Sequence, residues 1–323
     1  MRINKKQKYG YFTNEYDASK NNSFLRVLKW RMFYKNPQKQ EFDNDLFVPN
    51  VIESRAPDKK TDKLIWLGHA TFIIDLGSTR LLLDPCLTNP PMFKRRTKLP
   101  FEIAEIHPDL ILVSHGHYDH FDGDTINMLG GTYTALVPIG LARYTKKLKL
   151  KCIEMDWSES YKIADIEIVF LPAYHWHSRF GFDKNTALWG SFLIRYRGLQ
   201  IYFCGDSGYN THFTKIRKQY GDMDICIMPV GAYKPDFIMK HSHMNPHESM
   251  QAFGDLGGKV FVPMHYGTFI LSDEPPSEGI GMTRTAADGG TLGGELRELD
   301  IGEAMELKNN SHIDLLAQKL YNV

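Results

Sequence analysis

The sequence predicts an α/β fold. Short apolar segments with strand character follow one another from residue 63 onward, and helical segments lie between them. Four of the strand-like segments end in a histidine or an aspartate, or reach one in the loop just beyond. No Gly/Pro/Ser-rich linker divides the chain, so residues 61–323 are expected to form one domain behind an N-terminal arm of residues 1–60.

The composition limits the classes of protein to consider. Lys and Arg number 39 and Asp and Glu 38, a net charge of +1, so charge gives no reason to expect a nucleic-acid partner. No segment has enough uninterrupted apolar residues to span a bilayer, and the N-terminus lacks the pattern of a secretory signal. The four cysteines form no Cys-x-x-Cys pair, which favours free thiols over a disulfide framework or a thiolate zinc site. A cytoplasmic protein is therefore expected.

The N-terminal arm is basic, with ten Lys and Arg residues against two acidic residues in positions 1–40. Its segment SFLRVLKWRMFYK (23–35) has apolar residues at helical spacing and predicts an amphipathic helix. Two interpretations stay open. The helix either contacts an anionic membrane surface or a lipid-like substrate, which would make the protein peripheral to the membrane, or packs its apolar face on the main domain.

Three strand-like runs open the main domain, LIWL (64–67), TFIID (71–75) and RLLLD (80–84), with glycine turns between them. They predict an antiparallel meander. DLILVSHGHYDHFD (109–122) predicts a strand that runs into a histidine-rich loop, and DGDTINMLGG (122–131) a helix that ends at its glycine pair.

The second half continues the alternation. TALVP (134–138) predicts a strand and IGLARYTKKLK (139–149) a helix, before the strand IEIVFLPA (166–173). SFLIRY (191–196) and LQIYFCGD (199–206) predict a hairpin. The strands DICIMPVGAY (224–233) and KVFVPMHYG (259–267) flank a helix that begins near Pro246.

The densest chemistry lies in the loop SHGHYDHFD (114–122). His115 and His117 are two apart on an extended segment, so their side chains point the same way and can bind one ion. Asp119 and His120 follow in a turn. Three imidazoles and a carboxylate crowded after one strand have little structural use without a metal, whereas each of the later His and Asp residues taken singly would be ordinary loop chemistry.

Three further residues follow other strands: His175, Asp206 and His265. With the loop they make seven candidate ligands, more than the three or four that a mononuclear site needs, which favours a binuclear centre. Nitrogen and oxygen donors without cysteine suit two Zn²⁺ ions, with iron or manganese as alternatives. Such a centre makes hydroxide available at neutral pH, so hydrolysis is the expected chemistry.

These motifs resemble the metallo-β-lactamase superfamily. SHGHYDHFD resembles its HxHxDH signature, and PAYHW, GDSGY and PMHYG resemble its later metal-bearing motifs. WLGHATFIID, LLLDPCL, HYDH, LWGSF, GDSGY, PVGAY and HxxPxE are similar to the group of N-acyl-phosphatidylethanolamine-hydrolysing phospholipase D and its bacterial relatives. The resemblance covers about residues 62–272 and implies an αβ/βα four-layer sandwich with two mixed β-sheets.

The resemblance also implies roles for the seven candidates. His115, His117 and His175 would hold one zinc, Asp119, His120 and His265 the other, and Asp206 would bridge them. A metal-bridging hydroxide would attack the phosphorus of a phosphodiester, with Asp119 and Asp206 orienting it or accepting its proton.

The remaining histidines and one tyrosine lie outside the set of seven candidate ligands. Tyr118 and His243 resemble positions near the substrate, although a packing aromatic and a helix-entry residue are equally open interpretations. His177 is an alternative to His175. His69 is expected to be structural, beneath the site, and the expected surface residues are His107, His212 and His247.

The predicted function is thus a binuclear zinc hydrolase, a phosphodiesterase that acts on a phospholipid-like or smaller substrate. The enzymatic rivals are a lactonase of the ascorbate-phosphate lactonase type and a nuclease. From other classes come a non-catalytic metal-binding or lipid-binding protein and a redox di-iron protein. The oligomeric state stays open.

Overall fold

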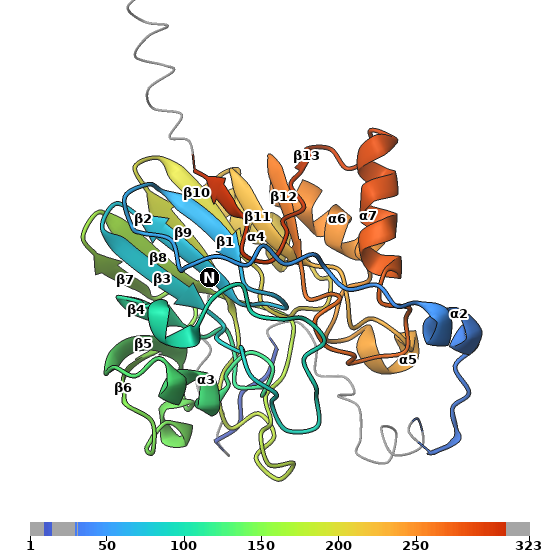
Figure 1. Ribbon diagram of the computed structural model, residues 1–323, viewed down its shortest axis with the longest axis horizontal. Helices are drawn as coiled ribbons and strands as arrows, with labels where there is room; N and C mark the ends of the chain where they lie inside the picture. Colours follow the sequence, from blue (N-terminus) through green and yellow to red (C-terminus); the bar gives the residue numbers. More distant parts are fainter. Residues whose placement is uncertain (1–9, 15–29, 31, 308–323) are drawn as a thin grey trace, which may run out of the picture.

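Two mixed seven-stranded β-sheets face each other, with helices on their outer sides (Figure 1). The structure is a computed structural model that describes residues 10–14, 30 and 32–307. It confirms the predicted sandwich of two mixed sheets flanked by helices.

The first sheet has the order β14-β1-β2-β3-β4-β5-β6. Its strands are β1 (Lys63–Trp66), β2 (Phe72–Leu76), β3 (Thr79–Leu83), β4 (Leu110–Leu112), β5 (Tyr133–Pro138), β6 (Leu150–Met155) and β14 (Ala304–Glu306). β1, β2 and β3 pair antiparallel, as the predicted meander requires, and β3 to β6 pair parallel.

The second sheet has the order β13-β12-β11-β10-β9-β8-β7. Its strands are β7 (Ser160–Ile163), β8 (Ile166–Leu171), β9 (Ser191–Tyr196), β10 (Leu199–Phe203), β11 (Ile225–Pro229), β12 (Val260–Met264) and β13 (Glu295–Leu296). The predicted β9–β10 hairpin is present, and its two turn residues, Arg197 and Gly198, both have positive φ, as a tight hairpin turn demands. β10 to β13 pair parallel.

The helices lie mainly beside the parallel halves of the sheets. They are α2 (Lys39–Asn44), α3 (Gly123–Met128), α4 (His212–Tyr220), α5 (Asp236–Met239), α6 (Pro246–Asp255) and α7 (Glu278–Asp288), with 3₁₀ turns η1 (Ile103–Glu105) and η2 (Ala142–Tyr144). α4, α6 and α7 lie beside β11 to β13, and α3 lies near β4 to β6 (Figure 1). None of the helices in the described ranges is both long and apolar enough to cross a membrane.

The main core lies between the two sheets. Side chains alternate along β1, so Leu64 and Trp66 enter this core while Ile65 joins a second apolar cluster on the outer face. Phe72 of β2 meets Phe203 of β10 edge to face, with ring centroids 6.3 Å apart, across the space between the sheets. Burial on both faces explains why these strands read as continuous apolar runs.

The predicted helix over residues 139–149 is wrong. The segment forms only the single turn η2 before β6 begins at Leu150. Gly140 has positive φ, and the Thr145 backbone N–H and hydroxyl both donate to the Ala142 carbonyl, which closes the turn and ends it.

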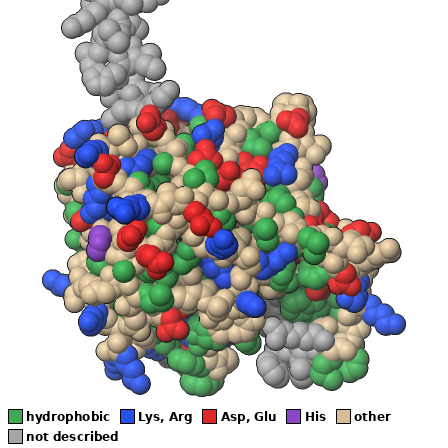
Figure 2. Space-filling view, viewed as in Figure 1, with side chains coloured by type: hydrophobic (Ala, Val, Ile, Leu, Met, Phe, Trp, Pro, Cys, Tyr) green, Lys and Arg blue, Asp and Glu red, His purple; other side chains and the backbone are tan. Residues whose placement is uncertain are grey.

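The arm is described in part. The predicted helix 23–35 lies mostly outside the described residues, although residues 30, 32 and 33 are helical. Trp30 donates its indole N–H to Asp273 at 2.7 Å, whereas Met32 and Phe33 are 60% and 73% exposed. On the face shown in Figure 2, acidic and basic side chains are interspersed, and no single charge dominates it.

Candidate metal centre

The carboxyl ends of strands from both sheets meet at one edge of the sandwich. β4 leads into the loop with His115, His117, Asp119 and His120, β8 is followed by His175, β10 by Asp206 and β12 by His265. All seven side chains predicted as ligands lie together there. The fold therefore brings residues 150 positions apart in the sequence into one cluster, because β4, β8, β10 and β12 all end at this edge.

The first group of donors is His115, His117 and His175. His117 Nδ1 lies 2.9 Å from His115 Nε2 and 3.2 Å from His175 Nε2. Three imidazole nitrogens that converge this closely cannot all be satisfied by one another's protons. They form a set of three atoms able to hold one metal ion.

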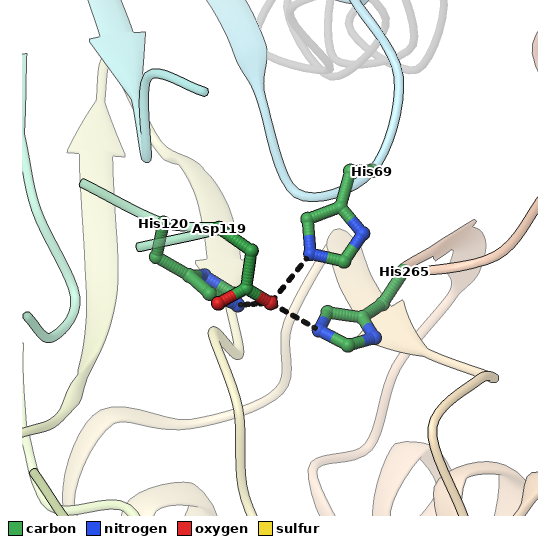
Figure 3. A group of neighbouring side chains, drawn as sticks. All are labelled: His69, Asp119, His120 and His265. Carbon is green, nitrogen blue, oxygen red and sulfur yellow. Dashed lines mark hydrogen bonds and ion pairs between the residues drawn. The ribbon is translucent and has the colours of Figure 1, made fainter. Parts of the chain in front are cut away.

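The second group is Asp119, His120 and His265, drawn with His69 in Figure 3. Asp119 Oδ2 lies 3.6 Å from His120 Nε2 and 3.7 Å from His265 Nε2. The group shares no residue with the first and offers a second position for a metal ion.

Asp206 lies between the two groups. Its Oδ2 is 3.9 Å from His115 and 3.8 Å from His175 of the first group, and 3.3 Å from His120 of the second. Its Oδ1 is 3.1 Å from His265 Nε2. A carboxylate that reaches both groups is what two metal ions sharing one ligand require.

Several donor atoms of the cluster have no hydrogen-bond partner among the described residues although they are buried: Nε2 of His117, His120 and His265, and Oδ1 of Asp206. Buried polar atoms are almost always paired, because leaving one unpaired costs about 1–3 kcal/mol. Of these atoms, Nε2 of His120 and His265 faces Asp119 and Asp206, so unpaired donors converge where a metal ion would sit, and the residues present fit metal binding.

Burial and charge set the protonation of the cluster. Burial lowers the pKa of His115 and His175 well below the usual histidine value. At His265 burial acts the same way, but the Asp206 and Asp119 carboxylates outweigh it and raise the pKa to about 9. The imidazoles hold the pKa of both carboxylates well below the usual range, against the effect of burial. The ionised carboxylates attract positive charge, which a metal dication can supply.

Asp84, at the end of β3, supports the cluster from behind and was missed in the sequence. It accepts hydrogen bonds from the Ser114 backbone N–H (2.6 Å) and hydroxyl (2.5 Å), and pairs with His120 Nδ1 at 2.7 Å. The last contact directs His120 Nε2 into the site. The available signal in the sequence was the aspartate that ends the apolar run RLLLD. In the structure this aspartate is fully buried.

His69 takes part in the cluster rather than lying beneath it. Its Nε2 is 3.0 Å from Asp119 Oδ2 (Figure 3). Its backbone carbonyl accepts the His265 N–H at 3.0 Å. Both His69 and His265 have positive φ, which strains the backbone of a residue other than glycine. Residues with such strain are often found at functional sites. The β1–β2 turn thus contacts two of the candidate ligands directly.

The structure places Tyr118 and His243 near the cluster of candidate ligands, and His177 away from it. His243 Nδ1 lies 3.6 Å from Asp206 Oδ2, and the Tyr118 ring lies under the Arg179 guanidinium at 4.1 Å. His177 is buried against Gly116 and Tyr144, away from the converging nitrogens, so His175 is the one that joins the cluster.

The prediction that His212 lies on the surface is wrong. The ring is 2% exposed, and its Nε2 lies 3.2 Å from the Ser207 hydroxyl. The amphipathic helix α4 was not predicted, so the buried face on which His212 lies was not recognised. His107 and His247 are exposed, as predicted.

A cavity of about 310 Å³ opens onto the cluster. Its inner wall contains His117, Tyr118, Asp119, Arg179, Asp206 and His243. Its outer wall is mainly apolar and includes Trp30, Met92, Phe93, Trp176, Ile238, Met239 and Leu271. A cavity that combines apolar lining residues with a few converging polar side chains is the expected form of a small-molecule site.

Residues 79–266 match the family model described as a beta-lactamase superfamily domain. The chain belongs to the metallo-β-lactamase superfamily. Its matched region contains the HxHxDH loop, His175, Asp206 and His265, so the predicted resemblance is confirmed.

Curated members of this superfamily are similar over most of the chain. The N-acyl-phosphatidylethanolamine-hydrolyzing phospholipase D of Saccharomyces cerevisiae mitochondria is 32% identical over 247 residues, 72% of this chain and 53% of that protein. The corresponding phospholipase D 1 of Caenorhabditis elegans is 30% identical over 273 residues, 77% and 76% of the two chains. A metal-dependent hydrolase of Pelotomaculum thermopropionicum is 30% identical over 250 residues, 76% and 100%.

Solved structures show the same metallo-β-lactamase fold. Igni18, a metallo hydrolase from Ignicoccus hospitalis, has a TM-score of 0.61 at 21% identity over 77% of this chain and 99% of its own. CmlA, a diiron β-hydroxylase from Streptomyces venezuelae, has a TM-score of 0.59 at 20% identity over 78% and 55%. The chain is a metal-dependent hydrolase of the metallo-β-lactamase superfamily.

Proposed function

We propose that this metallo-β-lactamase superfamily member is a binuclear zinc-dependent phosphodiesterase of the N-acyl-phosphatidylethanolamine phospholipase D type. The observation that supports two ions is the position of Asp206, whose two oxygens lie 3.3 Å from His120 Nε2 and 3.1 Å from His265 Nε2 and also face His115 and His175. His115, His117 and His175 would hold one ion, Asp119, His120 and His265 the other, and Asp206 both. Donors of nitrogen and oxygen only favour zinc over softer metals.

Metal ions held by these residues would supply Lewis acidity toward a phosphoryl oxygen and would lower the pKa of water in the site, so that hydroxide would be available at neutral pH. Side chains of the protein would handle the proton and contact the substrate. Asp119 and Asp206 would orient the attacking water, or one of them would accept its proton. Tyr118 and His243 line the same cavity as Asp206, and His243 Nδ1 lies 3.6 Å from Asp206 Oδ2, so both could contact a phosphate oxygen or the leaving group.

The cavity supports a substrate that carries both an anionic phosphate and an acyl chain. The Arg179 guanidinium is partly buried beside the cluster and supplies a fixed positive charge near the phosphate. The outer wall of Trp30, Met92, Phe93 and their neighbours offers apolar surface to the acyl chain. The yeast and nematode relatives, named for hydrolysis of such a phospholipid, support the same class.

A substrate panel tests this proposal. Zinc-loaded protein should hydrolyse N-acyl-phosphatidylethanolamine at the phosphorus and release the N-acylethanolamine, while a lactone and a thioester of similar size react far more slowly. Asp206→Ala should lose at least about two orders of magnitude in activity, because it removes a ligand of both ions. Turnover of the lactone without the phosphodiester would establish the lactonase instead, and no turnover by metal-loaded protein would favour the binding-only interpretation.

A further inference from the structure

The N-terminal segment of residues 10–14 is built into the core beside the metal centre. Phe12 is 1% exposed in the core between the sheets, and its backbone N–H donates to the Asn185 carbonyl at 2.8 Å. Two residues later, Asn14 lies against the segment that follows β8. A stretch expected to be part of a basic arm therefore contacts the chain next to a candidate ligand.

Asn14 holds the backbone of His175 at both of its polar groups. Its side-chain Nδ2 donates to the His175 carbonyl at 3.0 Å, and its Oδ1 accepts the His175 N–H at 3.2 Å. The same Oδ1 accepts the Trp189 indole N–H at 2.9 Å. One amide, 161 positions before His175 in the sequence, thus joins His175 to the buried tryptophan of the LWGSF motif.

The imidazole of His175 is held separately. Its Nδ1 pairs with the Ser242 carbonyl at 2.8 Å, which leaves Nε2 directed toward His117 Nδ1 at 3.2 Å. The ring and the backbone are therefore fixed by different partners. Because a small rotation of the backbone displaces the ring nitrogen at the far end of the side chain, loss of the backbone contact would misplace a donor whose bond to a metal has little tolerance.

We propose that Asn14 is a positioning residue of the metal centre, which fixes His175 for the ion held with His115 and His117. The inference rests on the proposed function, since it takes His175 to be a ligand. It assigns the N-terminal segment a part in assembling the site, apart from any contact of the arm with lipid. A truncation of the arm would therefore damage the metal centre as well as remove membrane contacts.

The test is metal affinity in full-length point variants. Asn14→Leu removes all three hydrogen bonds at similar volume, and Asn14→Asp keeps the two accepted bonds but loses the donated one. Tyr11→Ala, an exposed neighbour in the same segment, is the matched control. Chelator competition should show one of the two ions bound about 10–100-fold more weakly in Asn14→Leu, a smaller loss in Asn14→Asp and none in Tyr11→Ala.

A spectroscopic readout separates a positioning role from an effect on general stability. In Co²⁺-loaded protein the absorption spectrum of one ion should change in Asn14→Leu while that of the other is kept. Two ions held with unchanged affinity and spectrum, even with a lower Tm, would show a merely structural role and overturn the inference; Asn14→Asp decides the matter if Asn14→Leu does not fold. Wild-type protein that binds fewer than two ions would overturn the proposed function, and this inference with it.

Discussion

Asp206 has a carboxylate oxygen within 3.9 Å of nitrogen atoms from five histidines. Three come from outside the HxHxDH loop, so no local sequence pattern could show the arrangement. The motif order predicted which residues would meet. The distances add that Asp206 is placed centrally: its Oδ2 faces His115 and His175 of the first group and His120 of the second, and its Oδ1 faces His265 of the second.

At the residue scale, Asp84→Asn tests the support of the cluster. The substitution removes the anionic partner of His120 Nδ1–H, so the imidazole loses its fixed orientation. We expect activity and metal affinity to fall about 10–100-fold while the protein stays folded. Kinetics, chelator competition and circular dichroism measure these effects.

The control is Asp224→Asn, which changes a hydrogen-bonded carboxylate just before β11, away from the edge where the metal groups lie. It should leave metal affinity unchanged. An Asp84→Asn protein that binds and turns over like the wild type would remove Asp84 from the site.

At the element scale, the segment after β8 connects Asp183 to the HxHxDH loop through Arg179. Asp183 accepts the Arg179 and Phe180 backbone N–H groups, and Arg179 Nη1 donates to the Gly116 and Phe121 carbonyls at 2.8 and 2.9 Å. Burial alone would raise the pKa of Asp183, but hydrogen bonds from Phe180, Tyr144 and Ser178 outweigh it and lower the pKa to about 2.

This lowered pKa predicts a pH dependence of stability. Because the folded pKa lies below the unfolded one, the ionised Asp183 stabilises the fold above about pH 4, and this contribution is lost as the pH falls through about 2. Asp183→Asn should cost about 2 kcal/mol of unfolding free energy at pH 7 and roughly half of that at pH 3. Urea unfolding of both proteins at the two pH values measures this; a difference that grows toward acid pH would contradict the assignment.

The end of the arm allows a test of membrane contact. Met32 and Phe33 are exposed next to Trp30, which lines the cavity, and in Figure 2 apolar side chains gather over α5 at the lower right. Phe33→Ser should weaken binding to anionic vesicles severalfold without changing hydrolysis of a short-chain, water-soluble phosphodiester. Phe182→Ser, at another highly exposed phenylalanine, is the control; equal effects of the two changes would favour the arm as a structural element only.

Elements buried on both faces were predictable, because they are continuous apolar runs: β1 to β4 and β8 to β12. The half-exposed strands β6 and β7 and the short strands β13 and β14 carry no such pattern and were missed. α7 contains two glycines and two threonines, so packing rather than propensity maintains it. Asn14 and Asp84 act through contacts with distant residues, which a single sequence does not show.

At the scale of the whole molecule, the site is assembled from both sheets. β3 and β4 of the first sheet supply Asp84 and the HxHxDH loop, and β8, β10 and β12 of the second supply His175, Asp206 and His265. The two halves meet through the core between the sheets, so their relative position fixes the distance between the donor groups. The proposed two-metal centre is therefore a property of the assembled sandwich and not of any one motif.

Metal content per chain tests this account most directly. Wild-type protein loaded with zinc and freed of excess ion should contain about two ions per chain, and Asp206→Ala clearly fewer, because both donor groups lose the carboxylate between them. Tyr11→Ala should match the wild type. One ion or none in fully loaded wild-type protein, or an unchanged content in Asp206→Ala, would contradict the binuclear centre.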